Sequence, residues 1–168
     1  LPHQYELHKL PHDFTLINDL GTSHCYRWGY TKRPFPENDT FKKIKEIITS
    51  GTYGKIWRAE LQVGHYLPFW HPDEDYRVSY AARKSLGGGV LRTLGHEIDL
   101  CQYFFGGFNS VLAKVDTISD LDLDVDDNVE ILLTCEGCKS INIHLDYINP
   151  VPVRQGRLHF QQGLLTYD

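Results

Sequence analysis

The sequence predicts an α+β domain with an open, mainly antiparallel sheet and helices packed on one face. Two segments carry apolar residues at helical spacing, and about five others carry the β-branched and alternating residues typical of strands. Most of those strands are joined by links of hairpin length, which favours antiparallel neighbours. With 168 residues, of which 41% are hydrophobic and 12% aromatic, we expect one globular domain with a substantial core.

The first elements follow from local patterns. Apolar residues at helical spacing predict a short helix over residues 13–20, and aromatic residues predict a strand over residues 25–30 that ends at a Pro-Phe-Pro turn. A longer amphipathic helix follows, because Asp39 or Thr40 can cap its start and Gly51 is placed to end it.

A strand and a second long helix are expected in the middle of the chain. Residues 54–66 alternate between apolar and polar types, and a loop punctuated by prolines comes next. The helix is predicted from the triple glycine at 87–89 to Phe105. Its apolar stripe consists of Leu91, Leu94, Ile98, Cys101 and Phe105. Its polar stripe consists of Arg92, His96, Asp99 and Tyr103.

The remainder of the chain is rich in strands, which we expect over residues 110–118, 129–135, 139–147 and 157–160. Cys135 and Cys138 have the spacing of a redox pair, yet the Glu-Gly between them is typical of a two-residue hairpin turn. A thioredoxin-like role also requires a helix that begins after the first cysteine. We therefore expect two cysteines opposed on adjacent strands.

Charge and composition exclude several classes of protein. A net charge of -5 and scattered Lys and Arg residues argue against a nucleic-acid partner. No apolar stretch approaches the ~20 residues that span a bilayer, and the N-terminus lacks the pattern of a signal peptide, so we expect a cytoplasmic protein without a membrane partner. Four cysteines are too few for a disulfide scaffold. Because the chain contains no Met, we expect a fragment or a processed start.

Two further patterns suggest metal binding, and both have a simpler explanation. His65, His71, His96 and Glu97 do not match the spacing of a zinc site, so we expect no metal there. The acidic run at residues 120–127 lacks the glycine and the final glutamate of an EF-hand loop. A solvated link between strands is the favoured interpretation of this run.

The segment from Gly51 to Gly106 resembles the start of the C-terminal domain of Gfo/Idh/MocA oxidoreductases. The stretches GTYGKIWRAEL, YLPFWHPDEDYRVSYAARKSLGGGV and LGHEIDLCQYFFG carry the resemblance in this order. GYTKRPFP is similar to the segment that enters this domain in the family, and RQGRLHFQQGLLTYD is similar to the strand pair that closes its sheet. No Gly-x-Gly-x-x-Gly sequence opens a βαβ unit, so we expect no nucleotide site in this chain.

The resemblance implies a catalytic role for His96, because the family has a histidine at this position of the motif and an imidazole can both take and give a proton near neutral pH. Taken alone, a helical histidine is more often structural. Asp99 could orient His96, or it could pair locally. Thr93 departs from the family, in which an aspartate is common at this place. Lys9 would be the counterpart of the catalytic-site lysine, although its neighbours also depart from the family's Glu-Lys-Pro.

The loop after the strand at 54–66 is rich in aromatic and polar residues of the kind that bind sugars, and it could equally pack over the sheet as a small satellite core. The candidate substrate-binding residues of this loop are Tyr66, Trp70, His71, Tyr76, Arg77 and Tyr80. Arg33 could meet an acidic or phosphorylated substrate, or could be a plain surface arginine.

The resemblance therefore implies a fragment of an NAD- or NADP-dependent oxidoreductase that acts on a sugar or nucleotide sugar. Residues 30–168 would form the domain for substrate binding and oligomerisation, and residues 1–29 the end of a nucleotide-binding domain or a connector. We expect this fragment alone to bind no cofactor and to be inactive, and we expect the open sheet face to meet another subunit. The alternative is a binding or assembly module that has lost dehydrogenase chemistry.

Overall fold

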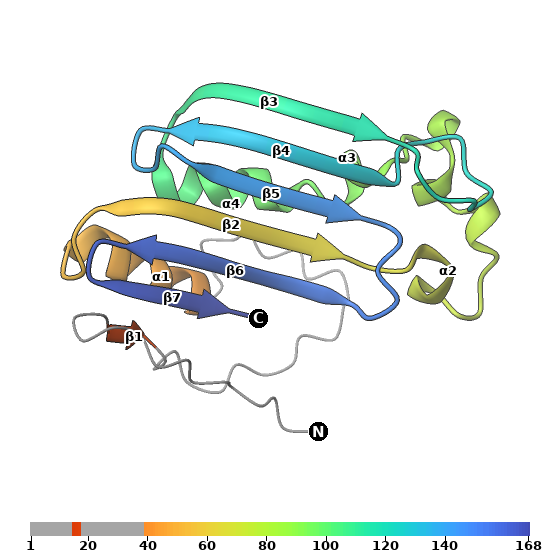
Figure 1. The fold of residues 1–168 in the computed structure, drawn as a ribbon. Coiled ribbons are helices and arrows are strands. Elements are labelled where there is room, and N and C mark those ends of the chain that lie inside the picture. The colour runs from red at the N-terminus through yellow and green to blue at the C-terminus, as the bar shows by residue number, and fades with distance from the viewer. Residues whose placement is uncertain (1–14, 18–38) are drawn as a thin grey trace.

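A seven-stranded sheet forms the centre of the computed structural model, which describes residues 15–17 and 39–168 (Figure 1). The strands lie in the order β1-β7-β6-β2-β5-β4-β3. Their bounds are β1 Thr15–Ile17, β2 Ile56–Gly64, β3 Phe108–Asp116, β4 Asn128–Cys135, β5 Ile141–Asp146, β6 Val153–Phe160 and β7 Gly163–Tyr167.

Most neighbouring strands are antiparallel, as the sequence predicts. The pairs β3–β4, β4–β5, β2–β6 and β6–β7 are antiparallel, while β2–β5 and β1–β7 are parallel. The central parallel pair places Ala59 beside Ile141 and Gly64 beside Asp146. The carboxyl ends of both strands therefore lie side by side at one end of the sheet, where the candidate site lies.

Helices cover one face of this sheet (Figure 1). They are α1 Asp39–Ser50, α3 Val90–Thr93 and α4 His96–Phe105, and a short α2 Leu67–Trp70 lies at the end of the sheet. Three 3-10 helices follow α2, namely η2 Tyr76–Val78, η3 Tyr80–Ala82 and η4 Lys84–Leu86. In the described part of the chain, no helix combines the length and the apolar character needed to cross a membrane.

The alternation of residues along the strands separates a core face from an open face. Ile131 and Leu133 of β4 are buried beneath the helices, whereas Leu132 between them is 54% exposed. The centre of the open face is polar, because Gln155 Nε2 donates to Gln62 Oε1 at 2.9 Å. This arrangement confirms the predicted fold class of an open, mainly antiparallel sheet with helices on one face.

Two local predictions were wrong. Residues 15–17 belong to strand β1, which runs parallel to β7, where apolar spacing predicted a short helix. The predicted helix from residue 90 to Phe105 is divided into α3 and α4 at Leu94 and Gly95. In the first case pairing with a distant strand overrides the local pattern, and in the second the chain turns at a glycine.

Candidate functional site

The break between α3 and α4 determines which side chains of α4 face the protein. A Cβ on Gly95 would lie 2.4 Å from the carbonyl oxygen of Leu91, so only glycine fits this turn. Because α4 begins anew after the turn, Glu97 is buried while His96 and Asp99 are exposed. The buried side chains of α3, α4 and the turn between them are Val90, Leu94, Glu97, Leu100, Cys101, Phe104 and Phe105.

Thr93 ends α3 and makes a structural contact. Its hydroxyl donates to the carbonyl of Gly89 at 2.8 Å, which closes the first turn of the helix. Tyr147, which follows β5, is fully buried beside it. Burial raises the pKa of the Tyr147 phenol, and the Thr93 hydroxyl partly opposes this effect. Thr93 is thus part of a packed environment, in which its hydroxyl is engaged by the backbone of its own helix.

Trp70 is the centre of an aromatic cluster at the end of β2 and β5. Its ring stacks on His71 with centroids 5.8 Å apart, and it lies 6.4 Å from Tyr80 and 6.2 Å from Tyr147. His65, at the end of β2, completes the cluster at 6.0 Å from Trp70. The cluster therefore joins the loop after β2, the segment after β5 and, through Tyr147, the end of α3.

A small hollow of about 70 Å³ opens within this cluster. Its described lining residues are Leu67, Trp70, His71, Glu74, Tyr76, Ser79, Tyr80 and Ala81. Four of the six predicted substrate-binding residues of the loop are thus brought together, and His96 does not line the hollow. Tyr66 packs instead on Phe69, with ring centroids 4.8 Å apart. The hollow has room for one polar group of a ligand, since a water takes about 30 Å³.

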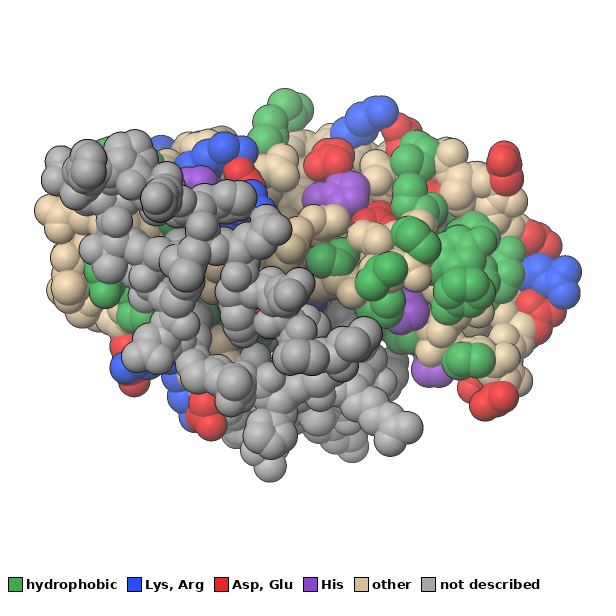
Figure 2. All heavy atoms as spheres, turned by 60° about the horizontal axis from the view of Figure 1, so that its bottom comes forward, with side chains coloured by type: hydrophobic (Ala, Val, Ile, Leu, Met, Phe, Trp, Pro, Cys, Tyr) green, Lys and Arg blue, Asp and Glu red, His purple; other side chains and the backbone are tan. Residues whose placement is uncertain are grey.

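Apolar side chains gather on the surface around the hollow. Figure 2 shows them at the end of the molecule where α2 and the 3-10 helices lie. Phe69 is 62% exposed, Val78 71% and Leu86 58%. An exposed apolar patch of this kind marks a place where a ligand or another protein surface is received.

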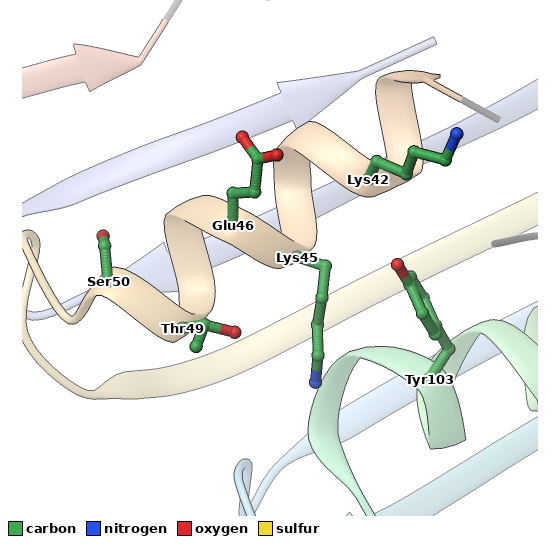
Figure 3. A pocket seen from close by; sticks show the side chains of 6 residues that line it. All are labelled: Lys42, Lys45, Glu46, Thr49, Ser50 and Tyr103. Carbon is green, nitrogen blue, oxygen red and sulfur yellow. The ribbon is translucent and has the colours of Figure 1, made fainter. Parts of the chain in front are cut away.

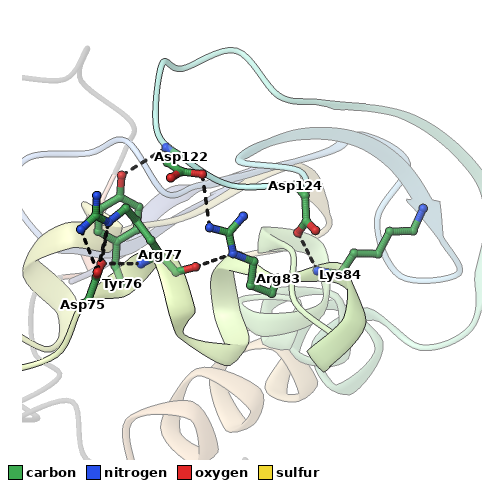
Figure 4. A network of polar contacts seen from close by, with 7 residues as sticks. All are labelled: Asp75, Tyr76, Arg77, Arg83, Lys84, Asp122 and Asp124. Carbon is green, nitrogen blue, oxygen red and sulfur yellow. Dashed lines mark hydrogen bonds and ion pairs between the residues drawn. The ribbon is translucent and has the colours of Figure 1, made fainter.

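The acidic segment at residues 120–127 holds the loop in place, which sequence reasoning missed. Asp122 accepts from Arg83 Nη2 at 3.2 Å and its backbone N–H donates to the Tyr76 hydroxyl at 3.1 Å (Figure 4). The Asp124 carboxylate accepts from the Lys84 N–H at 2.7 Å. The predicted solvated link between β3 and β4 is therefore also hydrogen-bonded to the segment of 3-10 helices. Alternation of Asp with Leu gave no signal of these distant partners.

Arg77 is engaged within its own turn. Its guanidinium donates to both oxygens of the Asp75 carboxylate, at 2.8 Å and 3.1 Å from Nε and 2.8 Å from Nη2 (Figure 4). This pairing lowers the pKa of Asp75. A substrate carboxylate or phosphate would have to compete with Asp75 for this arginine.

The triple glycine at 87–89 does not fit a phosphate group. The Leu91 N–H donates to the Asp126 carboxylate at 2.8 Å and the Val90 N–H to the Asp126 carbonyl at 3.0 Å, so an anion already lies at the start of α3. Gly88 and Gly89 also donate their N–H groups to backbone carbonyls. The triple glycine therefore offers no free cradle of N–H groups for the pyrophosphate of a dinucleotide.

A larger depression of about 510 Å³ lies between α1 and α4 (Figure 3). It is lined by Lys42, Lys45, Glu46, Thr49, Ser50 and Tyr103. Lys45 donates to the carbonyl of Phe104 at 3.0 Å and lies over the ring of Tyr103, so its charge is used to join the two helices. None of the residues predicted for the site lines it, and Tyr103 is about two turns along α4 from His96.

The remaining candidates can be placed briefly. Cys135 and Cys138 flank a turn between β4 and β5, in which the Cys135 N–H donates to the Cys138 carbonyl at 2.8 Å. Cys135 ends β4, but Cys138 precedes β5, so the cysteines are not opposed on adjacent strands as predicted. Burial raises the pKa of both thiols, which disfavours the reactive thiolate. Among residues 39–168, no group of three His, Cys, Asp or Glu side chains gathers to hold a metal ion. Lys9 and Arg33 lie outside the described residues.

Comparison with known proteins identifies relatives of this architecture. Residues 41–166 match the family model described as the GFO/IDH/MocA C-terminal domain. The WlbA dehydrogenase from Bordetella pertussis, solved with NADH and UDP-GlcNAcA, superposes with a TM-score of 0.65 at 18% identity, over 78% of this chain and 40% of that one. An inositol dehydrogenase homolog from Azotobacter vinelandii, solved with NAD+, gives a TM-score of 0.66 at 15% identity, over 79% of this chain and 36% of that one.

Levoglucosan dehydrogenase, solved with NADH and levoglucosan, gives a TM-score of 0.63 at 21% identity, over 74% of this chain and 36% of that one. The chain thus spans less than half the length of these three solved structures. At these identities the likeness shows a shared fold. No curated protein sequence matches the chain.

Proposed function

Because this chain belongs to the GFO/IDH/MocA C-terminal domain family, we propose that it is the substrate-binding part of an NAD- or NADP-dependent oxidoreductase acting on a sugar CH–OH group. The family membership is the observation that carries the proposal. Support for the cofactor comes from the solved relatives, which contain NAD+ or NADH. Since the triple glycine turn is occupied by Asp126, the dinucleotide is proposed to bind to a separate domain.

His96 is proposed as the acid or base of the reaction. It lies exposed in the first turn of α4, where an imidazole can take the proton of the substrate hydroxyl as the alcohol becomes a carbonyl. A nicotinamide, when bound, supplies the hydride chemistry that this conversion requires. Asp99, three residues further on, is exposed on the same helix and is proposed to orient His96 or the substrate. Lys9 is proposed as a second catalytic residue.

The aromatic cluster around Trp70 is proposed to bind the sugar. Flat aromatic faces beside hydrogen-bonding groups suit a sugar ring, which has apolar C–H faces and directional hydroxyls. Trp70, His71, Tyr76 and Tyr80 surround the small hollow, which suits one hydroxyl or hydroxymethyl group rather than a whole ring. Tyr66, Arg77 and Arg33 are proposed to contact the rest of the substrate.

The experiment is turnover by the full-length oxidoreductase with a panel of sugars and nucleotide sugars. Replacing His96→Ala is expected to lower kcat by ~100-fold or more, the usual effect of losing a general acid or base. Gln102→Ala is the matched control, because Gln102 is exposed on the same helix and has no proposed role. Equal turnover by the two variants would remove His96 from the mechanism.

A binding or assembly module without dehydrogenase chemistry is the second candidate function. Two observations favour it, namely the neutral Thr93 bonded to Gly89 and the Arg77 guanidinium already paired with Asp75. Calorimetric titration of the full-length protein separates the candidates, since sugar binding without turnover in the presence of NAD or NADP supports the module. The proposed inactivity of residues 1–168 alone is tested by the same titration with each nicotinamide.

We further propose that the open sheet face meets another subunit and that the protein is cytoplasmic. No helix of the described residues covers this face (Figure 1), and its polar centre at Gln62 and Gln155 suits a hydrated contact between subunits. The free cysteines among the described residues agree with a reducing compartment. Sedimentation of the wild type and of Gln62→Lys tests the contact. The variant buries one lysine of each subunit in the contact, so its assembly is expected to dissociate.

A further inference from the structure

Strand β3 is exposed along its whole length, which is unusual for a strand in a folded protein. All of its residues from Phe108 to Val115 are exposed, and only Asp116 is partly buried. Four of them are large and apolar, with Phe108 45%, Val111 66%, Leu112 69% and Val115 44% exposed. A long edge strand that exposes apolar side chains is a template for pairing with another strand.

The exposure arises because β3 extends beyond the helix layer. Val111 and Val115 lie opposite Leu133 and Val129 of β4, and these two partners are buried beneath the helices. On the open face, Leu112 lies opposite Leu132, which is 54% exposed. The helix-side face of β3 is therefore apolar, and its open face carries Leu112 between Ser110 and Lys114; neither face is covered by a helix or strand of the described residues.

Devices that normally protect an edge are scarce in β3. It contains no proline, and its pairing with β4 is regular from Ser110 to Asp116, with the register shift confined to its start. Its one lysine, Lys114, is paired with Asp116 of the same strand at 2.7 Å. Within residues 15–17 and 39–168, no strand pairs with the outer edge of β3.

We propose that the outer edge of β3 pairs antiparallel with β3 of a second copy of this chain, about a two-fold axis at Leu112. This register overlaps the whole strand from Phe108 to Asp116 and places Leu112 opposite Leu112 of the second copy. Because Leu132 lies beside Leu112, an apolar row of two leucines from each copy then crosses the open face of a continuous sheet.

The charges of β3 agree with a second copy as the occupant. Lys114 meets Ser110 of the second copy in this register, and Asp116 meets Phe108, so no like charges face each other. Val111 meets Ala113, which pairs small apolar side chains on the other face. The contact is isologous and uses a different surface from the open face, so the two contacts together would give a tetramer with dihedral symmetry.

Cross-linking tests the register in the full-length protein with Cys25→Ser. Leu112→Cys places two thiols opposite each other, at the Cα separation of about 4.5–5.5 Å that both strand pairs and disulfides share. Mild oxidation is expected to yield a covalent dimer of Leu112→Cys within minutes and little of Lys114→Cys, whose thiol would face Ser110. Equal yields from the two variants, or none from Leu112→Cys, would overturn the proposal.

Sedimentation tests the contact without oxidation. Leu112→Lys brings two ammonium groups together and is expected to halve the mass of the assembly, whereas Val151→Lys, at a 69% exposed valine in the link between β5 and β6, is expected to leave it unchanged. A monomer at high wild-type concentration, or an assembly insensitive to Leu112→Lys, contradicts a second copy as the occupant. Loss of mass in Gln62→Lys alone would assign the association to the open face instead.

Discussion

Glu97 Oε1 accepts a hydrogen bond from Arg154 Nε at 2.7 Å, which joins α4 to β6 beneath the sheet. The Glu97 side chain is only 2% exposed, and the Arg154 guanidinium also lies over the ring of Phe41. Burial raises the pKa of Glu97, and the charge of Arg154 opposes this effect. Because Glu97 follows His96 directly, this bond also fixes the direction in which α4 begins.

Removing one partner of this pair is expected to be costly. Glu97→Ala should lower the free energy of unfolding by about 3–5 kcal/mol, because a charged guanidinium then loses its buried counterion. Urea denaturation of residues 1–168 measures the loss. The double variant Glu97→Leu and Arg154→Met should recover most of it, since apolar side chains of similar volume replace both charges. A double variant less stable than Glu97→Ala would contradict this account.

Gly89 is expected to tolerate a side chain less well than Gly87. Both have positive φ, 113° and 84°, but a Cβ on Gly89 would lie 2.4 Å from Asp126 Oδ1 while a Cβ on Gly87 meets nothing within 4 Å. Gly87→Ala should cost about 1–2 kcal/mol from backbone strain alone, and Gly89→Ala should cost more because the clash is added.

Thermal unfolding of both variants gives the comparison. Adding Asp126→Ala should relieve the steric part in Gly89→Ala and have no such effect in Gly87→Ala. If the double variants lose stability additively at both positions, the contact between Gly89 and Asp126 carries no strain.

His144 is expected to make stability fall as pH rises above neutrality. Hydrogen bonds to the carboxylates of Asp146 at 3.0 Å and Glu130 at 2.7 Å raise the pKa of His144 above its ordinary value of 6.5, despite partial burial. The stabilisation is therefore complete below pH 6.5 and is lost as pH rises through the raised pKa of the folded protein. His144→Gln should flatten this decline in urea midpoints measured from about pH 5.5 to 8.5.

His159 provides the opposite case on β6, which β2 separates from β5. Burial is the largest effect on it and lowers its pKa, although Glu60 opposes this. Protonation then destabilises the fold as pH falls below 6.5, so His159→Gln should gain stability relative to the wild type at acid pH. The same sign of change in both variants would show that neither imidazole acts through the contacts described.

Trp70→Ala is expected to weaken sugar binding by about 3- to 10-fold in the full-length enzyme, since an aromatic contact contributes roughly 0.5–1.5 kcal/mol. The change should appear in KM more than in kcat, because Trp70 holds the substrate and does not transfer its proton. Trp57→Ala is the control, as that tryptophan is 56% exposed near the start of β2. Equal KM values for the two variants would separate the aromatic cluster from substrate binding.

The helix α1 and the strands β2 to β6 were predictable because their signals are local, whereas β7 was expected only from the resemblance. Asp39, the apolar stripe and Gly51 mark α1 without reference to the rest of the chain, and Glu136-Gly137 marks the hairpin between β4 and β5. The family motif likewise predicted the class of domain, which the match over residues 41–166 confirms.

Most of the rest depends on contacts between distant segments. The turn at Gly95 is local, since the missing Cβ leaves room for the Leu91 carbonyl, but nothing in the apolar spacing of residues 91–105 indicates it. Glu97 is buried because Arg154 lies on a strand far along the chain. The acidic segment at residues 120–127 accepts hydrogen bonds from Arg83 and Lys84, and the alternation of Asp with apolar residues does not indicate these partners. The aromatic residues could likewise be predicted from the sequence, but their arrangement around Trp70 could not, because it also depends on a distant segment.

The parallel pairing of β2 with β5 also has a consequence for how the chain is made. Ala59 can pair only after Ile141 has been synthesised, so this buried contact in the middle of the sheet forms late in the growth of the polypeptide. A ribosome releases the Trp70 loop well before Tyr147, the residue against which it packs. Nascent chains halted before β5 should therefore expose the apolar face of β2, and such intermediates are natural clients of chaperones.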